Sequence, residues 1–524
     1  MLRAVSAARL GTWQSLRAVA GSWRLLSVAL LSFASGLPLG LVWIAIPAWL
    51  TRAGVDIRIV GLLTLAQAPW TFKLLWSPSM DRYPLPFLGR KRGWILASQC
   101  ALVVLGLALA RVSDQPQDVW LIGTFAMLIA FASATQDIAY DAYTVEVLRP
   151  EEHGLAVGAR AAFYRAAMLV SGGAAITWAG ATSWAFVNLV MALAYLPFMV
   201  VTWLAPEPEA LPAPPGTLRE AVWGPFVSFL KQHRALEILA FVVLYKLSDQ
   251  LTQALTRPFL VQVGFNDFDV GIATATIGQA AAVGGTFLGG LLTERLGLGR
   301  ALWIFGLLQI VSNLGYAAVA QVGVNRPVMY AAVGFELLST GLGSGAFGVL
   351  LLRLTQKRFS ATQYALLSSL FTIPRVLAGP PAGLLADAIG WRDFFVLTVL
   401  TGIPGMVMLS RFVPWRVRDP QFHVAAPERG RPLARTGLAL RALLAVLAAG
   451  AIGILALGTL SATSSYRGSK AFDLTGGIRA VLHPVSQADW ISLASLGVFA
   501  LLTGLATAAT LVARRGVLSG PGGN

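Results

Sequence analysis

Two aspartates stand four residues apart in a stretch that is otherwise apolar enough to lie in lipid. Asp137 and Asp141 belong to the segment FASATQDIAYDAYTVEV, and a spacing of four places both carboxylates on one face of a helix. An ionisable residue at the centre of a bilayer costs about 2.5 to 3.5 kcal/mol. The pair therefore predicts an interior cavity or a cationic partner rather than contact with lipid.

Close carboxylates are also suited to handling protons. Two of them cannot easily both ionise in a poorly solvated site, which favours a site that takes up and releases a proton. We expect Asp137 and Asp141, together with Glu336 in a later apolar run, to be proton-coupling residues. No cofactor is expected beyond the proton gradient itself.

Other charged residues inside apolar runs extend this polar interior. With the three acids above, the set holds five cations and four acids, the remaining members being Lys73, Arg165, Lys246, Asp249, Arg257 and Arg375. At about 3 kcal/mol each, exposing them to lipid would cost about 25 kcal/mol, more than the net stability of a typical protein. They must face inward, pair with one another or meet water.

Two segments present whole polar faces, which favours a lined cavity. In YKLSDQLTQALTR the polar side chains recur at offsets of three, four, seven and eleven, one continuous helical stripe. Because the cations outnumber the acids, the cavity suits an anionic substrate. The expected substrate-binding residues are Lys73, Gln136, Tyr140, Arg165, Lys246, Asp249, Gln250, Gln253, Arg257 and Arg375.

A structural ion pair is the alternative for each of these charges. Lys73 with Asp137, or Arg375 with Glu336, would neutralise one another without contacting any ligand. Two full polar faces exceed what is needed to hold helices together, so we favour the cavity for the set as a whole.

Composition places these residues in a polytopic α-helical membrane protein. The chain has 524 residues, of which 56% are hydrophobic and 12% charged, about half the charged fraction of a soluble domain. Many apolar runs exceed the roughly 20 residues that a helix needs to cross a bilayer. The single cysteine, Cys100, excludes a disulfide framework. No metal-ligand spacing, phosphate loop or nucleophile motif occurs, so we expect neither a metal site nor an enzyme.

The apolar runs predict fourteen spans, arranged as six plus six plus two. The expected parts are a basic amphipathic segment at 1–24, a six-helix bundle at 25–204, a cytoplasmic linker at 205–234, a second six-helix bundle at 235–413, a basic cytoplasmic loop at 414–435, two additional helices within 436–513 and a tail at 514–524.

The basic residues predict the orientation. Lysines and arginines gather in the loops after spans 2, 10 and 12, whereas the opposite loops are short and neutral or acidic. Since cytoplasmic loops carry the excess of Lys and Arg, both termini are expected in the cytoplasm. The formal net charge of +16 then reflects topology. The expected partners are substrate, lipid and protons, with no nucleic acid, and the protein is expected to be a monomer.

A loop pattern occurs twice, once in each predicted bundle. In SPSMDRYPLPFLGRKRG an acid-Arg pair is followed by Gly-Arg, and GGLLTERLGLGR repeats both pairs at the matching place in the second half. This resembles the loop signature of the major facilitator superfamily, whose fold is two six-helix halves around a central cavity. The resemblance implies a gating loop that contains Asp81, Arg82, Arg90 and Arg92.

Longer motifs resemble the AmpG muropeptide permeases. From about residue 25 to beyond residue 410 they include FASGLP, FKLLWSP, DRY followed by GRKRGW, SATQDI, YR followed by MLVSGG, APEP, LYKL and FSATQ. The resemblance implies a proton-driven importer of anhydro-muropeptides in a bacterial inner membrane, used in peptidoglycan recycling and influencing β-lactamase induction. It also implies functional roles for residues inside the matching motifs, namely Lys73, Gln136, Asp137, Asp141, Arg165, Lys246 and Asp249.

Three other functions are compatible with parts of this pattern. A carrier of another organic anion, such as acyl-CoA, would use the same fold and cations. A membrane-embedded enzyme would need a metal-binding acidic motif or a large extramembrane domain, and the sequence has neither. A receptor without transport activity is disfavoured because polar faces occur in both halves.

Overall fold

The chain is described by a computed structural model in which every described regular element is helical. The structure describes residues 21–55, 66–85, 88–113, 118–208, 212–377, 382–383, 385–386, 389–422, 434–467, 472–485 and 487–515. These residues form two compact units. Unit 1 comprises Met1–Val222 and Glu237–Gln421, and unit 2 comprises Trp223–Leu236 and Phe422–Asn524.

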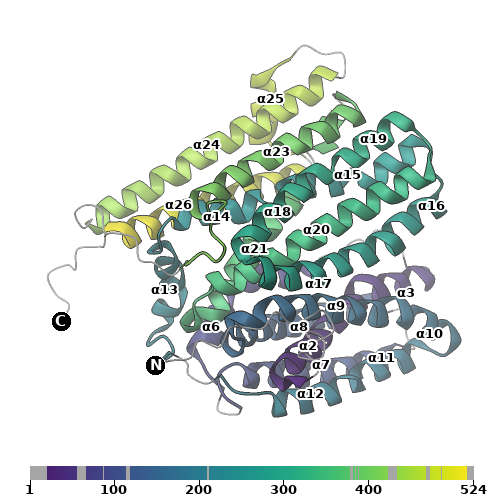
Figure 1. The fold of residues 1–524 in the computed structure, drawn as a ribbon. Coiled ribbons are helices and arrows are strands. Elements are labelled where there is room, and N and C mark those ends of the chain that lie inside the picture. The colour runs from purple at the N-terminus through teal and green to yellow at the C-terminus, as the bar shows by residue number, and fades with distance from the viewer. Residues whose placement is uncertain are drawn as a thin grey trace. The chain divides into compact units, whose positions relative to one another are not determined.

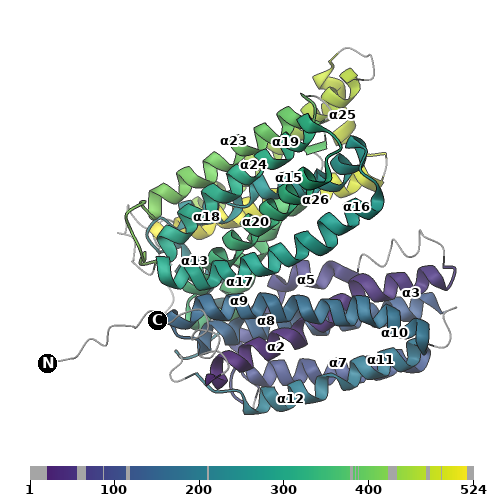
Figure 2. The same cartoon turned by 45° about the vertical axis from the view of Figure 1, so that its right-hand side comes forward.

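Unit 1 contains two helical bundles, drawn in purple to blue and in teal to green (Figures 1 and 2). The first, called the N half, consists of α2 (Trp23–Gly40), η1 (Leu41–Ala45), α3 (Ile46–Arg52), α5 (Ala68–Phe72), η3 (Lys73–Leu75), α6 (Ser77–Arg82), α7 (Arg92–Val112), α8 (Val119–Val147), η4 (Pro150–Glu152), α9 (His153–Met168), η5 (Leu169–Ala174), α10 (Ala175–Ala181), α11 (Trp184–Leu193) and α12 (Tyr195–Leu204).

The second bundle of unit 1, called the C half, follows the linker that contains the helix α13 (Leu218–Leu230). It consists of α14 (Ala235–Leu244), α15 (Leu247–Val263), α16 (Asp267–Gly271), η6 (Ile272–Ile277), α17 (Gly278–Leu296), α18 (Leu298–Ser312), α19 (Leu314–Val322), α20 (Arg326–Leu354), η7 (Lys357–Phe359), α21 (Ser360–Leu377) and α23 (Trp391–Phe412).

After the second bundle, the described residues of unit 2 form three helices, where the sequence predicted two. They are α24 (Arg435–Arg467), the short α25 (Leu474–Leu482) and α26 (Gln487–Arg515). Asp473 begins α25, since its carboxylate accepts a hydrogen bond from the backbone N–H of Gly476 at 2.9 Å. Gly477 of α25 lies so close to Gly458 of α24 that a side chain at either position would collide with its neighbour.

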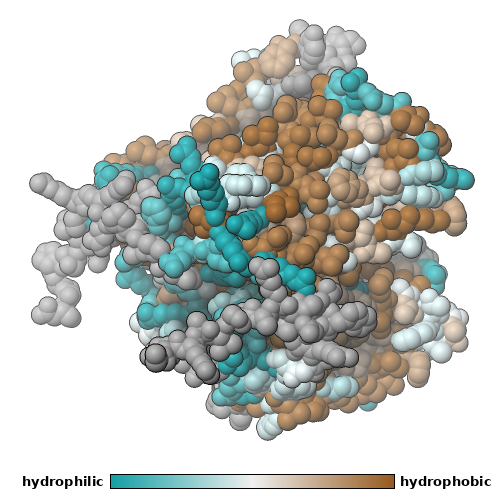
Figure 3. Space-filling view, in the orientation of Figure 1, coloured by the Kyte–Doolittle hydropathy of each residue, from teal (hydrophilic) through white to brown (hydrophobic). Residues whose placement is uncertain are grey.

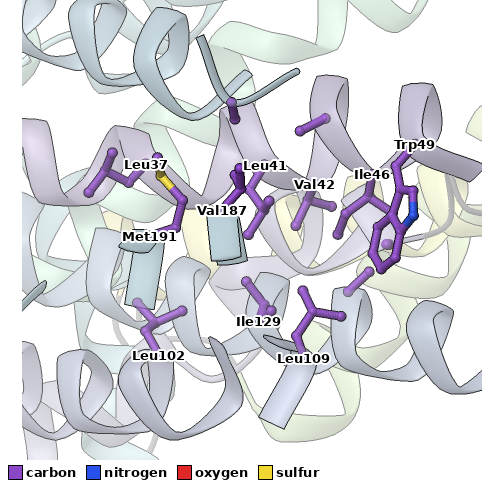
Figure 4. Packing of buried hydrophobic residues seen from close by; sticks show 14 of the residues in the cluster. Leu37, Leu41, Val42, Ile46, Trp49, Leu102, Leu109, Ile129, Val187 and Met191 are labelled. Atoms are coloured by element: carbon purple, nitrogen blue, oxygen red, sulfur yellow. The ribbon is translucent and has the colours of Figure 1, made fainter. Parts of the chain in front are cut away.

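Each half of unit 1 has its own apolar core. In the N half, α2, η1 and α3 pack against α7, α8 and α11 through side chains such as Leu41, Trp49, Leu102, Ile129 and Met191 (Figure 4). In the C half a second core joins α15, α19, α20 and α23 around aromatic rings that include Phe259, Tyr316 and Phe395. The polar side chains considered below are held between these rigid packed helices.

The halves meet closely where α9 crosses α17. At Gly154 and Gly290 the two backbones approach so closely that a Cβ at Gly154 would lie 2.2 Å from the carbonyl oxygen of Gly290. One turn further along α9, a Cβ at Gly158 would lie 3.0 Å from Phe287. Glycine is therefore required at this crossing, because any side chain would push the helices apart.

The described residues include nine helical stretches long and apolar enough to cross a membrane. They are Trp23–Arg52, Arg92–Val112, Val119–Val147, Trp184–Leu204, Asp267–Leu296, Leu298–Val322, Arg326–Leu354, Trp391–Phe412 and Thr436–Thr459. The all-helical membrane fold agrees with the expectation, while the count of fourteen spans stays a prediction. Hydrophobic residues cover much of the face seen in Figure 3.

Candidate functional site: two buried ion clusters and a gate

The N half contains a buried cluster centred on Asp141. Its carboxylate accepts a hydrogen bond from Lys73 Nζ at 3.3 Å and another from Arg160 Nη2. Arg160 also donates to the hydroxyl of Tyr364 at 3.2 Å, and its guanidinium lies 5.0 Å from the centre of the Tyr140 ring. We call Lys73, Asp137, Asp141 and Arg160 the N-half cluster.

Breaks in helical structure help to position this cluster. Lys73 lies on the 3-10 turn η3 between the short helices α5 and α6, each of which carries a proline in its first turn. Proline removes a backbone donor and clashes inside a helix, so this apolar run is divided into short pieces. The turn carries the ammonium of Lys73 to Asp141 on α8, while α9 supplies Arg160.

Asp137 and Asp141 are both almost completely buried, at 8% and 4% exposure, but they have different partners. Asp137 accepts a hydrogen bond from the Ser35 hydroxyl of α2, whereas Asp141 contacts the two cations. Lys73 therefore forms its ion pair with Asp141. The alternative considered from the sequence paired it with Asp137, four residues earlier. The two carboxylates lie on one face of α8, as predicted. They differ in their partners, because Asp137 has a hydroxyl and Asp141 has two cations.

Two further predicted residues flank the aspartates on α8. The hydroxyl of Tyr140 donates to the backbone carbonyl of Val28 at 2.9 Å, so its oxygen is engaged inside the N half. The amide of Gln136 is buried, and neither of its polar atoms has a hydrogen-bond partner among the described residues. Buried amides are normally paired, which leaves Gln136 able to bond with water or a ligand.

The C half contains a separate cluster, formed by Lys246, Asp249 and Glu336. Lys246 lies at the break between α14 and α15 and is 1% exposed. Its ammonium donates to Asp249 at 3.0 Å, to the backbone carbonyl of Thr340 at 3.1 Å and to Gln309. Since an ammonium has three N–H donors, this geometry favours a structural ion pair for Lys246 and Asp249.

Glu336 of α20 lies beside that ion pair. Its carboxylate accepts hydrogen bonds from Gln253 and Thr340, each at 3.1 Å, and from the hydroxyl of Tyr316 at 3.3 Å. These donors are neutral, so no cation contacts the carboxylate among the described contacts of Glu336. The Thr340 hydroxyl also lies 3.2 Å from a carboxylate oxygen of Asp249, so its one proton is shared between the two acids and links them into one network.

The remaining predicted substrate residues are not part of either cluster. Arg165 is exposed and donates from α9 across to Gln279 of α17 at 3.5 Å. Arg257 is exposed on α15, and Gln250 is half-buried on the same helix. The side chain of Arg375 lies outside the described residues, so its suggested pairing with Glu336 stays a prediction.

At one end of unit 1, Asp81 in the last turn of α6 joins the halves, and we call this the basic end. The buried carboxylate of Asp81 accepts the backbone N–H groups of Ala361 and Thr362, at 3.1 and 2.8 Å, and so caps the first turn of α21. Lys91 donates to the same carboxylate at 2.7 Å. A carboxylate at a helix N-terminus satisfies unpaired donors and the helix dipole together.

Arginines of the predicted gating loop add further contacts at the basic end. Arg90 donates to the carbonyl of Arg358 in the C half at 2.7 Å, and Arg92 bonds with Glu207 and the carbonyl of Ala205 in the linker. Arg82 is half-buried, with its guanidinium 5.3 Å from the centre of the Tyr83 ring.

In the second copy of the loop pattern, an acid of the C half caps a helix of the N half. Glu294 of α17 accepts the backbone N–H of Leu155 in the first turn of α9 at 2.9 Å. Between the two copies, Glu146 at the end of α8 accepts a hydrogen bond from the Ser360 hydroxyl at 2.6 Å. Acids of both halves therefore hold the basic end of unit 1 closed. We call the contacts of Asp81, Glu146 and Glu294 the gate.

His153 lies buried at the start of α9, ahead of the membrane-spanning part of that helix. Burial, with the nearby cations Arg353 and Lys357, lowers the pKa of His153 to about 3. Its Nδ1 has no hydrogen-bond partner among the described residues. The imidazole is therefore neutral at physiological pH.

Sequence reasoning missed several residues of these networks. Arg160 lies within a predicted span only five residues before Arg165, so the burial argument used for Arg165 would have found it. Gln309, Tyr364 and Glu146 gave no such signal, because uncharged or span-end residues are common in membrane helices. Among the residues that the structure describes, no group of His, Cys, Asp or Glu is arranged to hold a metal ion.

Comparison with known proteins agrees with this architecture. Residues 28–379 match the family model described as Major Facilitator Superfamily. Among solved structures, the proton:xylose symporter XylE covers 75% of this chain and 96% of its own, with a TM-score of 0.56 at 12% identity. The human organic anion transporter MFSD10 has a TM-score of 0.56 at 13% identity, covering 74% of this chain and 99% of its own. These two similarities show the fold.

Relatives with higher identity place the chain more narrowly. The anhydromuropeptide permease of Escherichia coli (strain K12) is 42% identical over 385 residues, which cover 72% of this chain and 78% of that protein. An uncharacterized protein of Haemophilus influenzae is 33% identical over 75% of this chain and 95% of its own length. The chain therefore belongs to the Major Facilitator Superfamily and, within it, to the family of the AmpG-type permeases.

Proposed function

We propose that this protein imports anhydro-muropeptides from the periplasm to the cytoplasm for peptidoglycan recycling. The observation that carries the proposal is the 42% identity, over 78% of its length, to a protein named anhydromuropeptide permease. Such a substrate joins a disaccharide to a peptide with carboxylates. A carrier of acyl-CoA or another organic anion would share the fold, and the 42% identity to an anhydromuropeptide permease favours the muropeptide.

Transport is driven by protons that bind at the buried acids. Asp141 is held between two cations, Asp137 by a serine hydroxyl, and Glu336 by neutral donors. The carrier needs an acid that can change its charge without unfolding the protein, and each of these buried carboxylates has polar partners that stabilise it inside the bundle. This supports the assignment of Asp137, Asp141 and Glu336 as the proton-coupling residues.

The substrate binds to groups that have free hydrogen-bonding capacity or exposed charge. Gln136 has unpartnered polar atoms, Arg257 and Arg165 present exposed guanidinium groups, and Gln250 is half-buried on the same helix as Arg257. A second group of predicted residues bonds with the buried acids or with the backbone and positions the acids, namely Lys73, Tyr140, Lys246, Asp249 and Gln253. Arg375 is proposed as a further anion-binding residue from the sequence alone.

The gate at the basic end closes the cytoplasmic side of the carrier. Its lysines and arginines favour the cytoplasm for this end, and Asp81, Arg82, Arg90 and Arg92 form the gating loop. Alternating access then requires the caps of Asp81 and Glu294 to break while the opposite end closes. We further propose fourteen spans in a bacterial inner membrane, cytoplasmic termini and a monomeric carrier.

Uptake of labelled anhydro-muropeptide into proteoliposomes tests the proposal. We expect accumulation with an imposed proton gradient, little without one, and no competition by excess acyl-CoA. Asp141→Asn should abolish the response to the gradient while substrate exchange between equal pools continues. Uptake that is blocked by acyl-CoA, or that never exceeds protein-free liposomes, would reject muropeptide import. Uptake unaffected by the gradient would reject proton coupling alone.

A further inference from the structure

One hydrogen bond crosses between the halves directly beside the N-half cluster. Nη2 of Arg160 bonds with Asp141, and Nη1 of the same guanidinium donates to the Tyr364 hydroxyl at 3.2 Å. Tyr364 belongs to α21 of the C half and is 6% exposed. A single planar group thus connects a carboxylate of one half to a hydroxyl of the other.

The two helices that this guanidinium links, α8 through Asp141 and α21 through Tyr364, also form part of the gate. Five residues beyond Asp141 on α8, Glu146 bonds with Ser360, which lies four residues before Tyr364 on α21. Ala361 and Thr362, in the same turn of α21, donate to Asp81. The bonds of Arg160 therefore connect α8, α9 and α21 about one helical turn away from the gate contacts.

The charges around Arg160 make its position depend on Asp141. The groups that act on the guanidinium are Asp141, Tyr140 and Asp137 of α8 and Tyr364 of α21, while Lys73 of η3 and Tyr164 of α9 share the site. Arginine stays charged under all relevant conditions. If Asp141 became neutral, Arg160 would lose its direct counterion and would still face the ammonium of Lys73, so its present position would become unfavourable.

We propose that Arg160 is a positioning residue that transmits the charge of Asp141 to the gate through Tyr364. With Asp141 ionised, the guanidinium is held in place and bonds α21 to the N half. When Asp141 takes up a proton, Arg160 releases Tyr364 and the first turns of α21 become free to leave Asp81 and Glu146. This inference rests on the proposed function for the identity of the proton-binding acid.

Hydrogen exchange at the start of α21, combined with a double-mutant cycle, tests the inference. Asp141→Asn mimics the protonated acid, and Tyr364→Phe removes only the hydroxyl that Arg160 contacts. We expect each single variant to speed exchange of the amides of 360–366 about two- to tenfold, the effect of losing one hydrogen bond. The double variant should exchange no faster than Asp141→Asn alone, because both changes remove one linkage.

Tyr330→Phe is the matched control. Its hydroxyl donates to Asp269 at 3.1 Å within the C half, so its loss should leave exchange at 360–366 unchanged. Arg160→Lys keeps the positive charge but removes the second N–H group that reaches Tyr364. Its exchange rates at 360–366 should equal those of Tyr364→Phe, which gives an independent test of the same bond.

Two results would overturn the inference: unchanged exchange in both Tyr364→Phe and Arg160→Lys, or effects of Asp141→Asn and Tyr364→Phe that multiply in the double variant. Neither depends on transport. Failure of the proposed function would instead be seen as gradient-independent uptake in the proteoliposome assay.

Discussion

The two halves of unit 1 hold their buried charges in different ways. In the N half, Asp141 contacts cations from two elements, and one of them, Arg160, reaches across to the C half. In the C half, the described partners of Lys246 and Asp249 lie within that half. A cluster shared between halves must change when the halves move, whereas a self-contained one can persist through the cycle. The N half therefore contains the responsive site and the C half a fixed support.

The largest expected effect comes from breaking the self-contained pair. Lys246→Met leaves Asp249 buried without a counterion and should lower the free energy of unfolding by about 3 to 5 kcal/mol. Lys73→Met should cost only about 1 to 2 kcal/mol, because Arg160 still neutralises Asp141. Denaturant unfolding in detergent micelles measures both. Equal losses in the two variants would contradict the distinction between the halves.

The next effect concerns the two copies of the loop pattern. Asp81 accepts two backbone N–H groups and also forms an ion pair with Lys91 at 2.7 Å, whereas the hydrogen bonds described for Glu294 are with the backbone N–H groups of Leu155 and Gly154. Asp81→Asn should therefore weaken the closed basic end by about 2 kcal/mol and Glu294→Gln by about 1 kcal/mol. Distances between spin labels on the two halves report the populations. A larger shift from Glu294→Gln would reverse the proposed ranking.

His153 allows a comparison that depends on pH. Its pKa of about 3 in the folded protein lies below the ordinary value of 6.5, so the unfolded chain binds a proton first as the pH falls. Stability should then decrease by about 2 kcal/mol between pH 7.5 and pH 5. His153→Gln should remove that part of the pH dependence. A wild-type and variant difference that is constant across this range would exclude the explanation.

The smallest effect is expected in the linker. Glu220 contacts Arg358 of the C half at 2.5 Å, but both side chains are partly exposed, at 35% and 45%. Exposed ion pairs contribute about 0.2 to 1 kcal/mol. Glu220→Gln should therefore change the ratio of open to closed gate by no more than about fivefold, and high salt should abolish the difference between the variant and the wild type. A shift as large as that of Asp81→Asn would show that the linker controls the gate.

Much of the fold was predictable because lipid imposes strict rules. Long apolar runs must be helices, and the repeated loop pattern marks two equivalent halves. The common face of Asp137 and Asp141 followed from spacing alone. Which partner each acid would have did not, because Lys73, Ser35 and Arg160 come from three separate elements whose packing is not visible in one sequence. The role of Lys246 was also hidden, since only its three acceptors separate a structural ion pair from a ligand contact.

The contact of Gly154 with Gly290 lies near the basic end, where α9 begins and α17 approaches its last residue. Because backbone lies directly against backbone at these two glycines, the halves can rotate there with little disturbance of packing once the hydrogen bond of Glu294 to Leu155 has broken. Rotation about a point near one end produces the greatest displacement at the other, so we expect a wide periplasmic mouth and a narrow cytoplasmic exit. A bulky disaccharide peptide could then enter freely but would leave slowly, making release rather than capture the step that limits turnover.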